Sequence, residues 1–442
     1  MSNRVIRLGG SHIGNSKSIQ NLNQFLAKNS DRKFVVVSAI PEILELIEQS
    51  ILNVFQQNID TNKLLVKLNS IFSEKTEIEI SADFEKLAEQ LTNLLKGVAL
   101  IGDYSTSLKD QILSFSEKLS VEILKTQWNK IETGIEIIWP ENIELFATSD
   151  FGNSTFVSIN NDTVSKLPKS IFIVPGSYGI TENGKVARTG KSSADYTAAF
   201  LTSELEAEKL ELWDLDNDFQ RADPQIVANP PVIKRLTYSE ASELAYFEHY
   251  SFHPRTVEPL ENKHIPIQVI NSATSQGNVE TIINTETFIE EQIVKSVACT
   301  NDISLLKLDG PGVGLKPGIL AKVTTKLNDA GINIKSVITS QTSINIVLAK
   351  QTGDKSLELV QQLGFSSVKE ISVEKDVSLI GIVGHGMQTN YGVSAKIFSA
   401  VASNKINVLL SGSGASDLVS YLVVKSFDKE KSVREIYKAF FS

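Results

Sequence analysis

The last third of the chain contains two copies of one sequence pattern. The stretch "ISLLKL" at Ile303 matches "VSLIGI" at Val377, and "GILAKVTTKLNDAGINI" at Gly318 matches "GVSAKIFSAVASNKINV" at Gly392. The same offset along the sequence aligns both pairs without a gap. Ala-Lys and Ile-Asn pairs in the same register favour duplication over chance similarity between two unrelated units. This part of the chain is therefore expected to fold as one small unit that occurs twice.

Each copy has the pattern of a strand, a glycine-containing loop, a helix and two more strands. The final strands are predicted at "SINIVLA" and "LVSYLVV". This order is typical of a small α+β sandwich. We predict the first repeat over residues 298–370 and the second over residues 371–442.

Residues 1–290 alternate strands and helices in a different way. A strand candidate at Val5–Leu8 leads into Gly9-Gly10-Ser11, and after the next helix comes the β-branched run "KFVVVSAI", of the kind buried in parallel sheets. Residues 41–132 read as mostly helical, and strands return in "GIEIIW", "STFVSI", "SIFIVPG", "LELW" and "IPIQVI". The pattern predicts an α/β domain, a three-layer sandwich with a mostly parallel sheet.

Size and charge narrow the class of function. With 442 residues, the chain exceeds the roughly 250–300 that one hydrophobic core organises, so two or three domains are expected. The net charge is −9, and no long basic run occurs. Because nucleic-acid binding depends on clustered Lys and Arg, we expect small-molecule chemistry, with neither nucleic acid nor membrane as a partner.

The expected compartment is the cytoplasm. The start, "MSNRVIRLGGS", lacks the apolar core of a signal peptide, and no run approaches the ~18 apolar residues that a membrane-spanning helix needs. Cys299 has no second thiol with which to form a disulfide or a structural zinc site. A metal site built from protein ligands is not expected.

The stretch "GKVARTGKSSADY" comes close to the phosphate-binding loop of P-loop proteins. That loop needs four residues between its first glycine and Gly-Lys-Ser/Thr, so that successive N–H groups surround the phosphates. Five residues separate Gly184 from Gly190, so the spacing is wrong by one. A P-loop is therefore not expected here.

Taken together, the motifs resemble those of aspartokinases. The stretches that carry the resemblance are "RLGGS", "VVVSA", "SEKLS", "SADYTAA", "RADPQIV", "RLTYSEASELAYF", "HPRTVEPLENKHIPIQVINS" and the two repeats. They follow the family's order over nearly the whole chain. The resemblance implies an amino-acid kinase domain followed by two ACT domains, which are ferredoxin-like modules that sense amino acids. It also places "TGKSSADYTAA" where the family has a substrate-facing Gly-Arg-Gly-Gly-Ser-Asp loop.

The activity that the resemblance implies is transfer of the ATP γ-phosphoryl group to the β-carboxylate of L-aspartate. The product, 4-phospho-L-aspartate, begins the lysine, threonine and methionine pathway. A carboxylate with a pKa near ~3.9 is already ionised at neutral pH, so the reaction needs no general base. It needs positioning and charge cancellation, with Mg²⁺ accompanying the ATP. Gly9, Gly10 and Ser11 would bring backbone N–H groups to the nucleotide, unless they form only a strand-to-helix turn.

The resemblance assigns four positions to the substrate. Glu117 matches the glutamate that binds the aspartate ammonium, and its alternative is a solvated carboxylate on a helix surface. Ser38 matches an active-site serine, or else it only ends a strand. Lys191 replaces the arginine that holds the α-carboxylate and loses its planar fork, so weaker binding is expected. Asp195 matches the aspartate that begins the next helix, where an N-cap is the alternative.

Several positions depart from the family. Arg7 stands for the lysine that stabilises the transferring phosphoryl group. Ser192, Ser193 and Ala194 replace two glycines and a serine of the family, which stiffens the substrate loop. In the nucleotide region Leu215 stands opposite the family aspartate, and a one-residue shift would bring Asp214 or Asp216 into that role. Residues that replace the family's Tyr, Arg and Lys near the nucleotide are Gln220, Gln225 and Tyr250.

Two functions in different classes are therefore open. The first is an aspartate kinase with altered phosphate contacts, which the nearly complete family pattern favours. The second is a catalytically weak or inactive relative that binds an amino acid or a partner subunit, which the lost cations favour. Phosphorylation of another amino-acid carboxylate is a weaker third reading, because the ACT pair points to aspartokinases.

The ACT repeats imply regulation and assembly into a homodimer. An amino-acid effector is expected at the loops 316–320 and 388–393. The positions assigned to it are Lys316, Gly318, Ile319, Gln341, Gly392 and Val393. Lysine-sensing relatives have carboxylates where this chain has Lys335 and Gln341, so lysine itself is not the expected effector. The alternative for each loop is a plain helix N-terminus.

Overall fold

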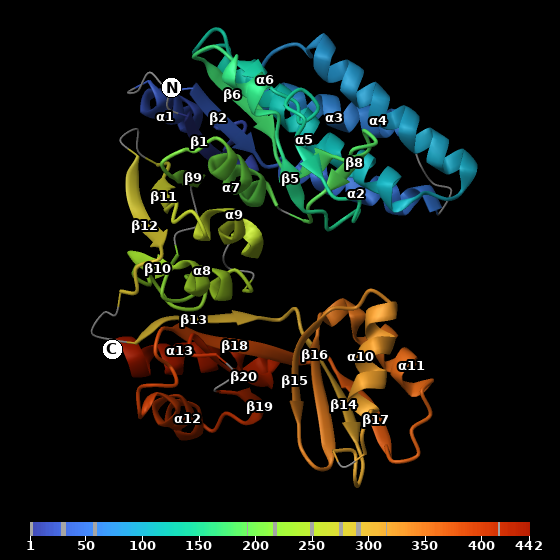
Figure 1. Cartoon of the computed structure of the whole chain (residues 1–442), viewed down its shortest axis with the longest axis vertical. Helices are drawn as coiled ribbons and strands as arrows, with labels where there is room; N and C mark the ends of the chain where they lie inside the picture. Colours follow the sequence, from blue (N-terminus) through green and yellow to red (C-terminus); the bar gives the residue numbers. More distant parts are fainter. Residues whose placement is uncertain are drawn as a thin grey trace. The chain divides into compact units, whose positions relative to one another are not determined.

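A computed structural model describes most of the chain. The described residues are 3–27, 32–55, 60–191, 193–214, 219–247, 252–273, 277–288, 293–314, 316–413 and 416–442. The chain divides into two compact units (Figure 1). The first comprises Met1–Asp218, Lys234–Ser242 and Ser251–Glu286, and the second comprises Phe219–Ile233, Glu243–Tyr250 and Thr287–Ser442.

An eight-stranded sheet organises the first unit, in the order β10-β12-β11-β9-β1-β2-β6-β3. Its strands are β1 (Asn3–Leu8), β2 (Arg32–Val37), β3 (Glu136–Ile137), β6 (Ile171–Pro175), β9 (Leu210–Asp214), β10 (Arg235–Thr237), β11 (Ile267–Asn271) and β12 (Asn278–Asn284). Among these described strands, β11 and β12 pair antiparallel and the other neighbours pair parallel. The predicted α/β sandwich with a mostly parallel sheet is confirmed.

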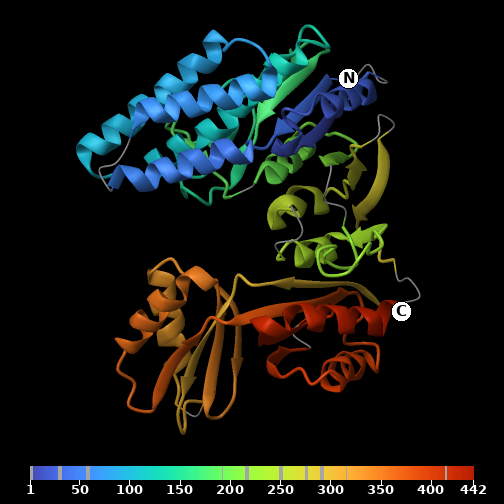
Figure 2. The same cartoon turned by 180° about the vertical axis from the view of Figure 1, so that it is seen from behind.

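Helices cover both faces of this sheet. The helices of this part of the chain are α1 (Ser16–Leu26), α2 (Pro41–Phe55), α3 (Thr61–Thr76), α4 (Ala82–Ile101), α5 (Thr106–Trp128), α6 (Asn161–Ser165), α7 (Ala194–Glu204), α8 (Tyr238–Leu244) and α9 (Glu258–Glu261). Helix α5 packs on β2 and β6, and α7 packs on β1, β2 and β9. Figures 1 and 2 show α2 to α5 side by side. Ile6 and Leu8 of β1 join the apolar core with these helices. Because successive side chains alternate across a strand, Arg7 faces the opposite layer, where α7 packs on β1 and β2.

A small four-stranded sheet, β5-β4-β7-β8, lies in the same unit. Its strands are β4 (Phe146–Ala147), β5 (Phe156–Ser158), β7 (Tyr178–Ile180) and β8 (Val186–Arg188). Strand β8 packs against α5 and ends at Arg188. The small sheet therefore brings the residues just before the predicted substrate loop next to α5.

The second unit contains the two repeats. The first has β14 (Ser304–Asp309), α10 (Ile319–Asp329), β15 (Ile334–Thr339), β16 (Ser343–Leu348), α11 (Gly353–Gln361) and β17 (Glu370–Glu374). The second has β18 (Val377–Gly384), α12 (Val393–Ser403), β19 (Val408–Gly412), β20 (Val419–Lys425) and α13 (Lys429–Phe441). Both bounds of α12 are displaced from those of α10 by the offset that aligns the sequence repeat. Each sheet is antiparallel, so the predicted α+β repeats are confirmed.

One strand that precedes the first repeat belongs to the sheet of the second repeat. Strand β13 (Val294–Thr300) precedes the first repeat, yet it pairs antiparallel with β18 of the second. The first repeat's sheet is completed by β17, which pairs with β14. The edge of β18 is thereby covered, and the second repeat includes residues from both sides of the first.

None of the helices within the described ranges has the length and apolar character needed to cross a membrane.

Candidate functional site

The glycine turn after β1 lies directly against the residues that follow β2. The turn continues as a short 3-10 helix over Gly10–His12, and the N–H of Ser38 donates to the carbonyl of Leu8 at 3.1 Å. A Cβ atom on Gly10 would lie 2.0 Å from the carbonyl oxygen of Ala39. Glycine at this position is therefore required by a backbone contact. The turn, exposed Ser11 and Ser38 come together at the carboxyl ends of two parallel strands, where α/β proteins bind ligands.

Arg7 and Asp195 form a buried ion pair behind this turn. Arg7 lies on β1 between Val36 and Leu212, and its Nε contacts Asp195 Oδ1 in the first turn of α7. Both side chains are buried. Asp195 Oδ2 also accepts the N–H of His253 at 3.2 Å. The helix N-cap is Ser193, so Asp195 is not the cap but the acidic partner of Arg7.

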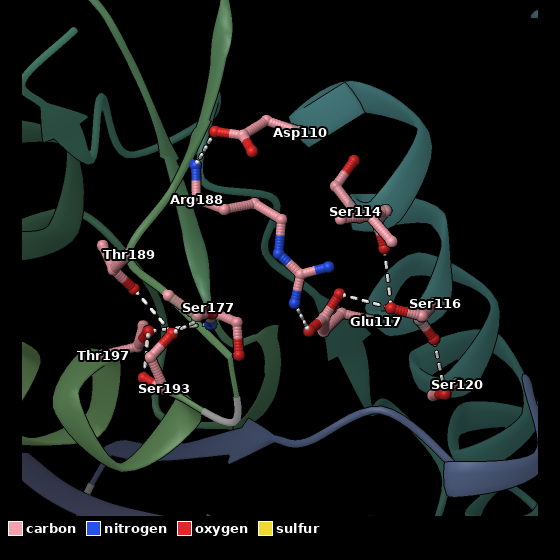
Figure 3. A network of polar contacts seen from close by, with 12 residues as sticks. Asp110, Ser114, Ser116, Glu117, Ser120, Ser177, Arg188, Thr189, Ser193 and Thr197 are labelled. Atoms are coloured by element: carbon pink, nitrogen blue, oxygen red, sulfur yellow. Dashed lines mark hydrogen bonds and ion pairs between the residues drawn. The ribbon is translucent and has the colours of Figure 1, made fainter. Parts of the chain in front are cut away.

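Hydroxyl groups hold the predicted substrate loop in place (Figure 3). Thr189 Oγ1 donates to Ser193 Oγ at 2.8 Å, and Ser193 Oγ donates to the carbonyl of Gly190 at 3.0 Å. The N–H of Ser177 donates to Thr197 Oγ1 at 2.9 Å, which ties the loop after β6 to α7. Ser192 lies outside the described residues. The loop is thus anchored at both ends by neutral hydrogen bonds.

Glu117 is buried and ion-paired with Arg188, a residue that the motifs did not single out. Arg188 Nη2 lies 2.9 Å from Glu117 Oε1, and the two side chains are 5% and 2% exposed. Ser116 Oγ donates to Glu117 Oε2 at 2.8 Å. Figure 3 shows the guanidinium reaching from β8 to the carboxylate on α5. The alternative of a solvated carboxylate on a helix surface was wrong, because Glu117 faces the small sheet.

A cavity of about 250 Å³ adjoins Arg188. The residues that line it are Leu44, Glu48, Thr106, Lys109, Asp110, Leu113, Phe151, Gly152, Arg188, Gly190 and Lys191. Asp110 Oδ2 accepts the N–H groups of Arg188 and Gly152, each at 2.8 Å. Burial raises the pKa of the Asp110 carboxyl, although these two N–H groups oppose the shift. Lys191 lies at the cavity with an exposed side chain.

The predicted nucleotide residues fall in different parts of the chain. Asp214 ends β9 in the first unit, whereas Gln220 and Gln225 belong to the second. Gln220 forms an isolated bridge with Val232, and the N–H of exposed Gln225 donates to Asp223 Oδ1. Asp216 and Tyr250 lie outside the described residues. The nucleotide assignments in this region stay predictions.

The predicted effector residues surround the first turns of α10 and α12. Gly318 and Gly392 are their N-cap residues with φ of 87° and 90°, values that glycine adopts readily. Ile319 and Val393 are buried in the two repeat cores, so only their backbone groups are available to a ligand. Lys316 and Gln341 are exposed. Lys335 Nζ donates to the carbonyl of Asp302 at 3.1 Å.

The comparisons with known proteins agree with the fold. The amino acid kinase family model matches residues 3–271, and ACT domain models match residues 299–359 and 380–440. The chain belongs to the amino acid kinase family. Its second unit carries the two ACT domains that the repeats predicted.

Relatives align along almost the whole chain. A bifunctional aspartokinase/homoserine dehydrogenase of Buchnera aphidicola is 24% identical over 99% of this chain, which spans 56% of that relative. The chloroplastic aspartokinase 2 of Arabidopsis thaliana is 26% identical over 99% of this chain and 84% of its own length. E. coli aspartokinase III, solved with aspartate and ADP, matches 100% of both chains with a TM-score of 0.83 and 21% identity. The resemblance to aspartokinases is confirmed, and the solved structure shares the fold.

His253 makes the stability of this region depend on pH. Burial is the main cause that lowers the pKa of its imidazole, although the Asp195 carboxylate opposes the shift. Protonation then favours the unfolded chain, so the free energy of unfolding falls as the pH drops below about 6.5, the ordinary value.

His253→Asn keeps an oxygen for the Arg255 N–H that His253 Nδ1 now accepts. Between pH 7.5 and 5.5, we expect the free energy of unfolding in urea to fall less for His253→Asn than for the wild type. His264→Asn, which changes an exposed histidine, should lose as much as the wild type. Equal losses in all three proteins would contradict this assignment.

Proposed function

We propose that this chain is an aspartate kinase, which transfers the ATP γ-phosphoryl group to the β-carboxylate of L-aspartate. The observation that carries the proposal is the position of Arg7 behind the glycine turn. A Cβ atom on Gly9 would lie 3.2 Å from Arg7 Nη1, so the guanidinium and the turn's backbone meet at one edge of the sheet. A cation and backbone N–H groups at the same edge suit a transferring phosphoryl group.

The chemistry requires little beyond positioning. A β-carboxylate oxygen attacks Pγ, the bond from Pγ to the β,γ-bridging oxygen breaks, and ADP leaves with that electron pair. The product is the acyl phosphate 4-phospho-L-aspartate. No proton is transferred, because the attacking carboxylate is ionised at neutral pH. Arg7 would stabilise the charge on the phosphoryl oxygens, and Asp195 would keep Arg7 in place.

Mg²⁺ would enter with the nucleotide. Within the described ranges, no three His, Cys, Asp or Glu side chains are grouped to hold a metal ion. Magnesium commonly keeps several waters and binds through substrate phosphates with one or two carboxylates. Magnesium would supply charge neutralisation on the phosphates.

Regulation and assembly are proposed by analogy with the family. The ACT domains would bind an amino acid other than lysine and pair two chains into a homodimer in the cytoplasm. The support is the pair of glycine-capped helix starts at Gly318 and Gly392, whose first-turn N–H groups suit an α-carboxylate. The proposed pathway is that of lysine, threonine and methionine.

A second candidate is a catalytically inactive relative that senses an amino acid. The observation that favours it is that Arg7 and Glu117, two of the charged side chains predicted to act on the ligands, both face protein partners of opposite charge. Such pairs hold a fold together without any substrate.

Calorimetry of Mg-ATP binding to the full chain separates the two candidates. An aspartate kinase is expected to bind Mg-ATP with micromolar to millimolar affinity and to bind it in the presence of aspartate as well. Heat from aspartate but none from Mg-ATP would support the sensor instead. GTP, titrated at the same concentration, serves as the control for nonspecific binding of a triphosphate.

A further inference from the structure

Arg188 has a buried donor that no group within the described residues uses. Its side chain is 4% exposed, and its Nη1 atom is buried without a hydrogen-bond partner among the described residues. The other terminal nitrogen, Nη2, contacts Glu117 Oε1 at 2.9 Å. Since a buried guanidinium nitrogen without an acceptor is costly, this atom marks a position where a ligand oxygen would bind.

We propose that Arg188, rather than Lys191, holds the α-carboxylate of the acceptor amino acid. This inference rests on the proposed function, because it names a contact to that function's acceptor. Arg188 lines the cavity of about 250 Å³ together with Lys191. Lys191 is exposed, whereas Arg188 is buried and keeps the planar fork that suits a carboxylate.

The Arg188–Glu117 pair is complementary to a zwitterion. An α-amino acid carries its carboxylate and its ammonium on one carbon, and here a guanidinium and a carboxylate lie side by side. A carboxylate accepts about four hydrogen bonds, so Glu117 keeps capacity for an ammonium after binding Arg188 and Ser116. Arg188 would bind the α-carboxylate through Nη1 while Glu117 binds the ammonium.

Both members of the pair are held rigidly. The N–H of Arg188 donates to Asp110 Oδ2 at 2.8 Å, which fixes the end of β8 against α5. Ser116 Oγ fixes the second oxygen of Glu117. Figure 3 shows the side chain of Arg188 extended between these two anchors. The donor is therefore preorganised by its contacts to the protein.

The test compares two ligands that differ only in the α-carboxylate. L-aspartate has it, whereas β-alanine keeps the ammonium and the other carboxylate but lacks it. We expect Arg188→Met to weaken aspartate binding about tenfold to a hundredfold, as for a charged hydrogen bond, and to leave β-alanine binding unchanged. Damage to the fold would weaken both ligands. Lys191→Met tests the competing assignment of the α-carboxylate to Lys191, and on this proposal it changes neither affinity by more than about threefold.

Calorimetry without nucleotide keeps this test separate from turnover. Arg188→Lys, which retains a charge beside Glu117 but has one nitrogen, covers the case in which Arg188→Met does not fold, and the same selective loss is expected. If aspartate and β-alanine bind the wild type equally, or if Lys191→Met removes the preference, the proposal is overturned. Absence of any aspartate binding to the wild type overturns it too. Selective binding without acyl-phosphate formation would support it while the kinase proposal fails.

Discussion

Gly10→Ala is expected to destabilise the first unit by about 3 kcal/mol or more, a large part of the roughly 5–15 kcal/mol that typically holds a domain together. The added Cβ would lie 2.0 Å from the carbonyl oxygen and 2.6 Å from the carbonyl carbon of Ala39. Those are backbone atoms just before α2, so no side-chain rotation relieves the overlap. The free energy of unfolding in urea measures the effect.

Gly9→Ala is the matched control for that substitution. Gly9 has φ of −65° and ψ of 144°, which alanine adopts without strain. The nearest atoms to its Cβ would be Arg7 Nη1 at 3.2 Å and the His12 ring at 3.4 Å. We expect a change of less than about 1 kcal/mol in stability, with weaker Mg-ATP binding if the turn approaches the phosphates. A Gly10→Ala protein as stable as Gly9→Ala would contradict the backbone contact.

Arg7→Met is expected to lower kcat at least about a hundredfold, the loss typical when one group that stabilises transition-state charge is removed. The substitution also leaves Asp195 buried without its cation, which costs about 3–5 kcal/mol of stability for such pairs. Arg7→Lys keeps a positive charge at the same position and should retain most of the activity. Steady-state rates per folded molecule, at saturating ATP and aspartate, measure the effect.

Arg4→Met controls for the loss of a β1 arginine. Arg4 lies on the same strand and binds both oxygens of buried Glu211, at 2.5 and 3.0 Å. Lys209 Nζ lies 3.3 Å from the same carboxylate, so Glu211 keeps a cation after the substitution. Because Arg4 lies at the amino end of β1, kcat should stay within about threefold of the wild type. Equal loss of kcat in Arg4→Met and Arg7→Met would show that the loss at Arg7 is not specific to the transferring phosphoryl group.

Local patterns were sufficient to predict most of the fold. Because of the constant offset between the repeats, α12 corresponds to α10 residue for residue. The same apolar spacing fixes which face of each helix is buried. The β-branched run in β2 was predictable because such continuous apolar runs are typical of parallel strands buried on both faces, and β2 pairs parallel with β1 and β6. The addition of β13 to the sheet of the second repeat could not be predicted, since pairing between strands on opposite sides of the first repeat leaves no local pattern.

Only the site residues that lie in recognisable motifs could be predicted from the sequence. Arg7, Glu117 and Asp195 came from the resemblance, and each lies buried beside an oppositely charged partner. Arg188 was missed, because an arginine before a loop glycine has no distinctive spacing and its partner is distant in the sequence. The chemistry of the loop could have identified it. Lys191 lacks the planar guanidinium of the family arginine, and Arg188 lies shortly before it in "RTGK". Sequence spacing alone does not show which cation is buried.

Hydroxylamine trapping of the acyl phosphate tests the central claim most directly. The full chain is incubated with Mg-ATP, L-aspartate and hydroxylamine, which converts an acyl phosphate to a stable hydroxamate. The account predicts hydroxamate that requires both ATP and aspartate and that falls at least about a hundredfold in Arg7→Met but not in Arg4→Met. A folded wild-type chain that binds aspartate yet forms no hydroxamate would contradict the account, and the chain would then be an amino-acid sensor built on a kinase fold.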